Sequence, residues 1–166
     1  MRDVRITGTR QLLDLQRQLR AAGDENLRRS MQRRVRRAAE PLRDDLQQTM
    51  RTLRIRSQGR RVSGGPSTNA RPLRETLAQT IKISVRNTGA AGARVWIDRS
   101  MLPRDMWNVP HQLNQGRLRH PVFGNRRRWA NQYADPWWDS TIRRHQARME
   151  REVARVVDDV QRRLGG

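Results

Sequence analysis

Histidines and acidic residues are the side chains in this sequence that could do acid–base or metal chemistry. The three histidines, His111, His120 and His145, share no metal-ligand spacing with one another or with acids. Adjacent acids occur at 44–45 and 158–159, but neighbours on a helix point about 100° apart and make poor proton-transfer pairs. The chain has no cysteine and no Gly-x-Ser-x-Gly nucleophile motif. We therefore expect no catalytic residues, no metal and no cofactor, and a protein that is not an enzyme.

Arginine is the side chain whose abundance points to a binding function. The sequence has 36 basic and 16 acidic residues, a net charge of +20, and Lys82 is its single lysine. A guanidinium group keeps its charge and offers a planar fork of donors to phosphates and carboxylates. This composition fits nucleic-acid binding or contacts with acidic neighbours in an assembly. It also fits a compositional bias that places arginine wherever a solvated side chain is tolerated.

The aromatic residues are concentrated in one part of the chain. Six of the seven lie between Trp107 and Trp138. Aromatic rings beside arginines can stack on the bases of single-stranded nucleic acid. Clustered aromatics more commonly form the core of a small domain or an interface with a partner. We expect core packing or subunit contacts, with base stacking as the alternative.

The N-terminal part of the chain has the periodicity of a strand followed by two helices. Alternation over residues 1–7 predicts a short strand, and the leucines of 10–22 predict a helix. Asp24 then begins a longer helix, in which apolar residues recur every three or four positions up to Leu53. Arginines occupy the opposite face of this second helix.

Residues 51–71 differ from the regions on either side. They contain six arginines and no acid, and they include the glycine- and serine-rich run 63–69. We expect a long, flexible basic loop or arm here. Such an arm could bind nucleic acid, become ordered only against a partner subunit, or act as a solvated linker.

The second half predicts paired strands followed by a helix. Alternating residues at 80–86 and 93–97 flank a turn-rich segment and predict a β-hairpin. Alternation at 118–122 predicts a second hairpin or an extended loop. Asp135 is expected to cap a C-terminal helix over 136–165, with a proline in its first position.

The order of these elements predicts the fold class. We expect an α+β protein, a single domain over residues 1–166, with a small antiparallel sheet and long amphipathic helices packed on it. The predicted fold also includes the flexible basic loop and the C-terminal helix. No stretch approaches the roughly 18 consecutive apolar residues of a membrane span, so we expect no membrane partner.

The segment 119–138 resembles a known family. It reads Arg-His-Pro-Val-Phe-Gly-Asn from Arg119, continues with Trp129 and Gln132, and has Pro-Trp-Trp at 136–138 before the long helix. These residues resemble the tail-completion proteins of long-tailed bacteriophages, also called minor tail, neck or head–tail joining proteins. The N-terminal strand, the leucine-rich helix and the long arginine-rich helix are also similar to the start of that family.

The resemblance implies a structural protein of the virion. It implies a homo-oligomeric ring of six copies that completes the tail and joins it to the head connector, made in the cytoplasm of the bacterial host. The implied partners are neighbouring neck and connector proteins and the tail-tube protein, and genomic DNA in the channel is a further candidate. The family has no catalytic residues, so none is carried over.

Two alternatives stay open. One is a different position in the same neck, as a tail terminator or a head-proximal connector or stopper protein. The other belongs to another class and is an arginine-rich nucleic-acid-binding protein that acts on phosphates.

Individual residues in and near this segment have expected roles. His120 and Pro121 should hold an extended chain, because proline biases the residue before it away from helix. Gly124 with Asn125 should provide a tight turn. The side chains expected to pack this loop onto the closing helix are Phe123, Trp129, Tyr133, Trp137 and Trp138. The arginines expected to contact a neighbouring subunit or DNA are Arg54, Arg56, Arg60, Arg61, Arg126, Arg127 and Arg128.

Overall fold

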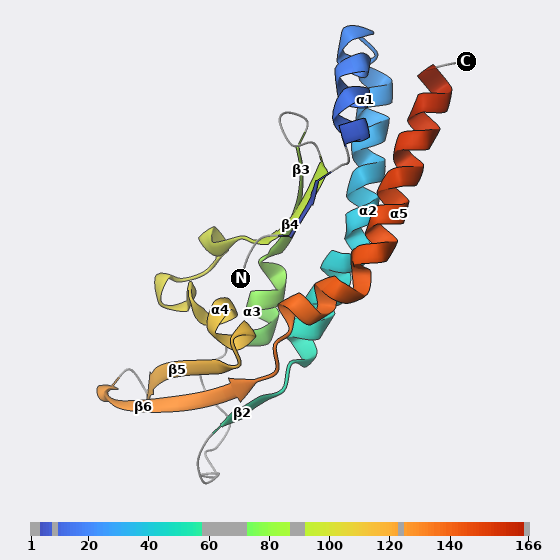
Figure 1. Cartoon of the computed structure of the whole chain (residues 1–166). Helices are drawn as coiled ribbons and strands as arrows, with labels where there is room; N and C mark the ends of the chain where they lie inside the picture. The colour runs from blue at the N-terminus through green and yellow to red at the C-terminus, as the bar shows by residue number, and fades with distance from the viewer. Residues whose placement is uncertain (1–3, 8–9, 58–72, 87–91, 123–124, 165–166) are drawn as a thin grey trace.

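Long helices and short strands alternate along the chain (Figure 1). This computed structural model describes residues 4–7, 10–57, 73–86, 92–122 and 125–164. Within these residues the fold is α+β as expected, with antiparallel sheets and a long helix at the C-terminal end. One hydrophobic cluster joins the buried side chains of the helices and sheets. No helix in these ranges is both long and apolar enough to cross a membrane.

The long helix α2 (Glu25–Thr52) is the central element of the structure. The Asp24 side chain caps it by accepting a hydrogen bond from the Leu27 N–H at 2.9 Å, which satisfies an otherwise unpaired amide of the first turn. The helix continues through Pro41 and ends before Leu53. The start and the apolar face expected from the sequence are confirmed. The buried stripe on that face is Met31, Val35, Ala39, Leu42, Leu46 and Met50.

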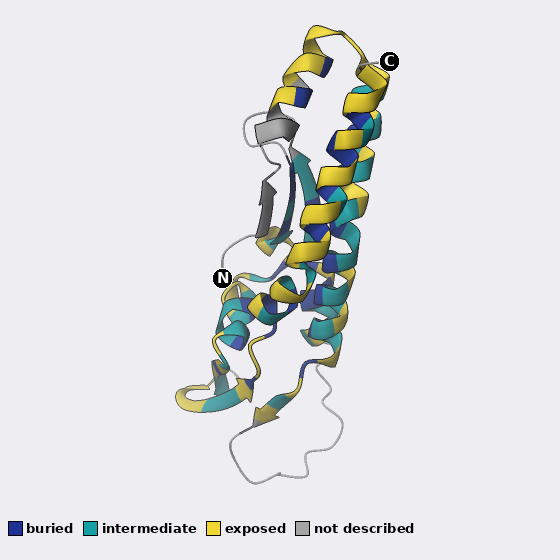
Figure 2. Cartoon of the chain, turned by 45° about the vertical axis from the view of Figure 1, so that its right-hand side comes forward, coloured by how far each residue is buried: buried dark blue, intermediate teal, exposed yellow. Residues whose placement is uncertain are grey.

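The helix α5 (Trp138–Leu164) packs alongside α2 (Figure 2). At one end of this pair, α1 (Arg10–Ala21) contacts both helices and buries Leu15 and Leu19. Gly23 has φ +67°, a left-handed conformation open to glycine, and this lets the chain turn from α1 into α2. The buried side chains of α5 are Trp138, Thr141, Met149, Val153, Val156, Val157 and Val160.

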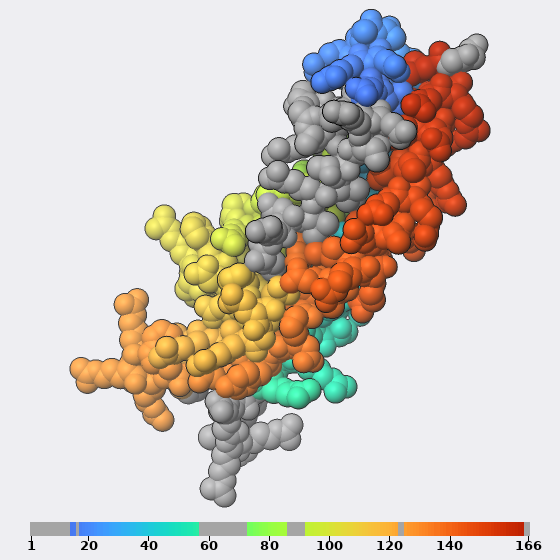
Figure 3. Space-filling view, viewed as in Figure 1, coloured from blue at the N-terminus to red at the C-terminus, as the bar shows by residue number. Residues whose placement is uncertain are grey.

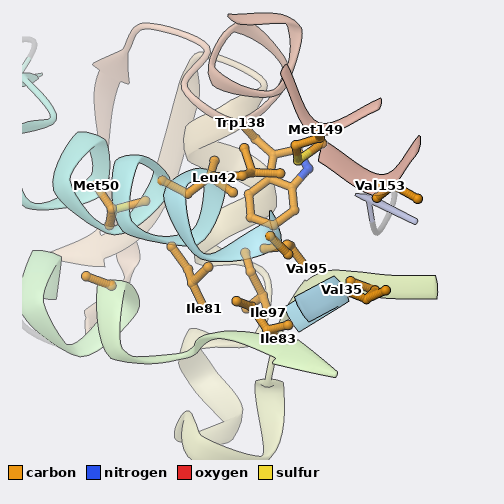
Figure 4. Close-up of a cluster of buried hydrophobic side chains, with 14 of the residues drawn as sticks. Val35, Leu42, Met50, Ile81, Ile83, Val95, Ile97, Trp138, Met149 and Val153 are labelled. Carbon is orange, nitrogen blue, oxygen red and sulfur yellow. The ribbon is translucent and has the colours of Figure 1, made fainter. Parts of the chain in front are cut away.

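The first sheet packs against α2 as well. Its order is β1 (Val4–Thr7), β4 (Gly92–Ile97) and β3 (Ile81–Arg86), with both pairs antiparallel. The predicted hairpin of β3 and β4 is therefore confirmed. A short helix, α3 (Leu73–Gln79), leads into β3 and also contacts α2. Alternate residues of the two strands are buried beside the α2 stripe (Figure 4): Ile81, Ile83, Val95 and Ile97.

The structure contains a second sheet, whereas the sequence predicted one small sheet. Its order is β2 (Ile55–Ser57), β6 (Asn125–Ala134) and β5 (Arg117–Val122), again antiparallel. The second predicted hairpin is thus formed by β5 and β6. The prediction of a flexible arm over 51–71 is wrong for the first part of that segment. Its first two residues belong to α2, and β2 after them pairs with β6. The rest of that segment, 58–71, lies outside the described residues.

Short helical segments connect the two sheets. They are η1 (Arg99–Met101), η2 (Arg104–Met106) and α4 (Val109–Asn114). The Asp98 side chain caps η1 by accepting a hydrogen bond from the Ser100 N–H at 3.1 Å. The single turns of helix in this region bring the end of α4 against the start of β5.

The start of α5 is capped by a residue from elsewhere in the chain. Asp135 was expected to cap this helix from position 136, and that expectation is wrong, because α5 begins at Trp138. The Asn114 side chain at the end of α4 accepts a hydrogen bond from the Trp138 N–H at 2.9 Å. The same side chain donates to Asp139 at 3.0 Å. Asn114 therefore fixes the first turn of α5 to α4.

Trp137 and Trp138 lie in the core at the start of α5. Each is 1% exposed, and their rings meet edge to face with centroids 5.3 Å apart. The Trp137 indole N–H has no hydrogen-bond partner within the described part of the chain. Trp137 thus stabilises the fold by packing, as the sequence predicted for both tryptophans.

Replacing Trp137 by alanine is expected to lower the free energy of unfolding by about 3–5 kcal/mol, because a large buried ring would leave a cavity. Trp137→Phe keeps an aromatic ring and removes a buried donor that lacks a partner, so its loss should be clearly smaller. Urea unfolding of both variants measures the difference. Stability close to wild type in the alanine variant would show that the ring is not part of the core.

A polar cluster joins α2 to α5 beside their apolar stripes. Asp45 accepts a hydrogen bond from Arg144 at 3.1 Å, and its carboxylate lies 2.8 Å from His145 Nε2. Partial burial acts to raise the pKa of Asp45, but the hydrogen bonds from His145 and Arg144 outweigh it and bring the pKa below its ordinary value of 3.8. The ionised carboxylate therefore stabilises the contact between the two helices.

The contribution of Asp45 to stability is expected to depend on pH. Because its pKa is lower in the folded state, the ionised form stabilises the fold above pH 3.8, and this is lost as the pH falls through the folded pKa. The difference in free energy of unfolding between wild type and Asp45→Asn should shrink as the pH falls below 3.8. Urea unfolding over a pH series measures it. A difference that persists unchanged throughout the acid range would contradict the pairing.

Candidate interaction face on the second sheet

The second sheet has one face toward the core and one toward solvent. Successive side chains of a strand point to opposite faces, and Leu118 of β5 and Ala134 of β6 are buried on the inner one. On the other face, Tyr133 lies directly opposite Arg56 of β2 and opposite Arg117 of β5. A row of arginine, tyrosine and arginine therefore crosses the three strands.

Two further pairs continue this face along the hairpin. Arg119 lies opposite Asn131, and Pro121 lies opposite Trp129. The Arg119 guanidinium sits 4.7 Å from the centroid of the Trp129 ring, a cation–π contact. We call the solvent-facing set the outer face: Arg56, Arg117, Arg119, Trp129, Asn131 and Tyr133.

Hydrogen bonds hold the outer face in place. Arg117 donates from Nε and Nη2 to Asn131 Oδ1, at 3.2 and 3.0 Å. The Trp129 indole N–H donates to the Arg126 carbonyl oxygen at 2.8 Å. These side chains are ordered before any partner arrives, so a partner would lose little of its binding energy to ordering them.

The two aromatic rings of the outer face are open to solvent. Trp129 is 47% exposed and Tyr133 is 39% exposed. The sequence predicted that both rings would pack the hairpin onto the closing helix, and this is wrong. Their positions in β6 alternate with those of the inner face, so both side chains point to solvent. The buried residues of the inner face are Leu118 and Ala134.

The charge of the outer face is entirely positive. The sequence has no acidic residue between Asp105 and Asp135, so no carboxylate of the hairpin can neutralise its arginines. Beyond Trp129, the exposed residues 126–128 add three more arginines near the far end of the hairpin (Figure 3). Next to Tyr133, a shallow hollow of about 50 Å³ is lined by Arg54 and Arg56 and also by Asp135, the first acid after the hairpin.

This arrangement is suited to binding rather than to proton or electron transfer. Arginine forks match carboxylates and phosphates, and flat aromatic rings offer apolar contact area. Arginine, tyrosine and tryptophan are the residues that interfaces with partners contain in excess. No group of three or more His, Cys, Asp or Glu side chains in the described part of the chain is placed to hold a metal ion.

The other residues singled out in the sequence differ in where they lie relative to the outer face. His120 and Pro121 lie in the extended strand β5, as predicted. Pro121 lies opposite Trp129, on the same side of the sheet as the outer face, and His120 has the parity of the inner face. Arg54, Arg56 and 126–128 are exposed and surround the aromatic pair. Four of these residues lie outside the described part of the chain: Arg60, Arg61, Phe123 and Gly124.

Three members of the outer face were not anticipated. Asn131 lies in β6 between Trp129 and Tyr133 at the same parity, and Arg117 and Arg119 lie opposite Tyr133 and Asn131 on β5. The alternation along β5 and β6 was the signal that could have found them. Comparison of the chain with protein-family models, with curated proteins and with solved structures finds no match in any of the three.

Removing the exposed rings is expected to leave the fold intact. Trp129→Ala and Tyr133→Ala should each change the free energy of unfolding by no more than about 1 kcal/mol, because surface side chains and exposed cation–π contacts contribute little. Urea unfolding gives the value. A loss as large as that of a buried tryptophan would mean that these rings are part of the core in solution.

Proposed function

We propose that the protein is a structural component of the virion of a long-tailed bacteriophage. In this proposal it forms a ring of six copies at the head–tail junction, completes the tail and joins it to the head connector. The resemblance of segment 119–138 to tail-completion proteins supports it. The observation that carries it is the outer face, with two exposed aromatic rings among arginines.

The shape of the chain suits assembly through this face. The β5–β6 hairpin extends away from the α2–α5 pair (Figure 1), so its outer face can meet a neighbour without disturbing the core. Exposed Trp129 and Tyr133 would supply the buried aromatic contacts that dominate many interfaces. The surrounding arginines would pair with carboxylates of an acidic neighbour and select its orientation.

A ring requires contacts of one kind between successive subunits. In a cyclic assembly, the face of one copy meets a different surface on the next copy, and the rotation closes the ring. The outer face is proposed as one half of that contact. The connector and the tail-tube protein are the proposed neighbours at the two ends of the ring, and the same reasoning applies to the related positions of tail terminator and stopper.

Nucleic-acid binding is the second candidate function. The outer face favours it through a specific feature, the alternation of aromatic rings with arginines on a sheet, which is also how single-stranded nucleic acid can be bound. Binding of this kind depends steeply on salt, because phosphate contacts release counterions. An interface built on Trp129 and Tyr133 depends on salt much less, and this separates the two functions.

Light scattering at low and high salt, with and without duplex DNA, tests the proposal. We expect a ring-sized oligomer that persists at high salt and does not change with DNA. The double variant Trp129→Ala/Tyr133→Ala should dissociate it, since the anchoring rings are lost. Trp107→Ala is the matched control, because Trp107 is also exposed, at 42%, but belongs to the segment between η2 and α4 and to neither strand of the hairpin.

Two results would contradict the assembly role. One is a monomer that binds duplex DNA at low salt and releases it at high salt. The other is an oligomer that the double variant and Trp107→Ala affect equally.

A further inference from the structure

A groove between α2 and α5 lies apart from the outer face. It has a volume of about 380 Å³ and is lined along α2 by Arg34, Arg37, Ala38 and Pro41. These residues share one side of the helix, because they are spaced three or four apart. Ala38 and Pro41 are small and rigid, and together with Val156 of α5 they form the apolar part of the lining.

The α5 side of the groove carries further charges. Its lining there includes Arg148 and Arg155 as well as the acids Glu152 and Asp159. Four guanidinium groups therefore share one hollow with two carboxylates. The groove has a net positive charge that its own lining does not cancel.

Both carboxylates of the groove are already engaged. Asp159 accepts a hydrogen bond from Arg34 at 2.8 Å, which lowers the pKa of Asp159, and it also pairs with Arg162. Glu152 accepts a hydrogen bond from Arg155 at 2.9 Å. Each acid is thus paired with an arginine, and neither pairs with the remaining two guanidiniums.

Arg37 and Arg148 are the two arginines of the groove that pair with neither acid. Across the part of the chain that the structure describes, neither forms a hydrogen bond or an ion pair. Both line the same groove, Arg37 from α2 and Arg148 from α5, and both are exposed. A guanidinium keeps its positive charge, so an anion is the chemical species that would pair with both.

We propose that the α2–α5 groove binds a chain of phosphate groups, with Arg37 and Arg148 as its principal ligands. Two planar forks on opposite walls match an anion that carries charge at two or more separated groups. The groove has the volume of a small-ligand site and has no acid free to repel the ligand. A free oligophosphate and the backbone of a nucleic acid share this chemistry. The site does not depend on the function proposed for the outer face.

Calorimetric titration of the whole chain with inorganic triphosphate at low salt tests the site. The double variant Arg37→Gln/Arg148→Gln should weaken binding about tenfold or more, because each charge-assisted hydrogen bond is worth roughly a factor of ten. The matched control is Arg36→Gln/Arg151→Gln. It removes the same charge from the same two helices, at exposed positions that do not line the groove.

A second titration with duplex DNA separates the two sources of phosphate. Loss of triphosphate binding in the groove variant alone assigns the site to a free oligophosphate, and loss of duplex binding alone assigns it to a nucleic-acid backbone. Equal weakening by the groove and control variants would overturn the proposal, because binding would then follow net charge. Citrate bound as tightly as triphosphate would overturn the phosphate assignment. Circular dichroism of each variant checks that it is folded.

Discussion

The buried stripe of α2 is the contact on which the rest of the structure depends. α5 packs on it, the β3–β4 hairpin packs on it, and α1 and α3 contact the same helix. Only 34% of the residues are hydrophobic, so the chain cannot build several independent cores. The apolar face of one central helix is instead shared by several neighbouring elements. The arginines then remain on the outside of the helices.

This central helix explains how the aromatic residues are divided. Trp137 and Trp138 lie at the point where α5 begins to pack on α2, and they fill the core there. The second sheet adds little to that core, since its inner face contributes mainly Leu118 and Ala134. Its other face is thus free to carry the exposed rings and arginines. We propose that the helices provide stability and the second sheet provides contacts.

Local sequence signals predicted much of the fold. The 3.6-residue period of α2, the cap at Asp24 and the alternation of β3 and β4 depend on neighbouring residues, and these were confirmed. Non-local pairing could not be predicted. β2 is a three-residue strand that exists only because β6 lies beside it, and Asn114 caps α5 from 24 residues away. At the outer face, residue type suggested buried rings while strand parity placed them in solvent.

We propose that the outer face is covered by a neighbouring protein in an assembled virion. Hydroxyl-radical footprinting of Trp129 and Tyr133, in the isolated chain and in phage particles that contain it, is the test. Both rings are expected to react in the isolated chain and to be protected in the particle, while the buried Trp137 is unreactive in both. Equal reactivity of Trp129 and Tyr133 in the two states would contradict it.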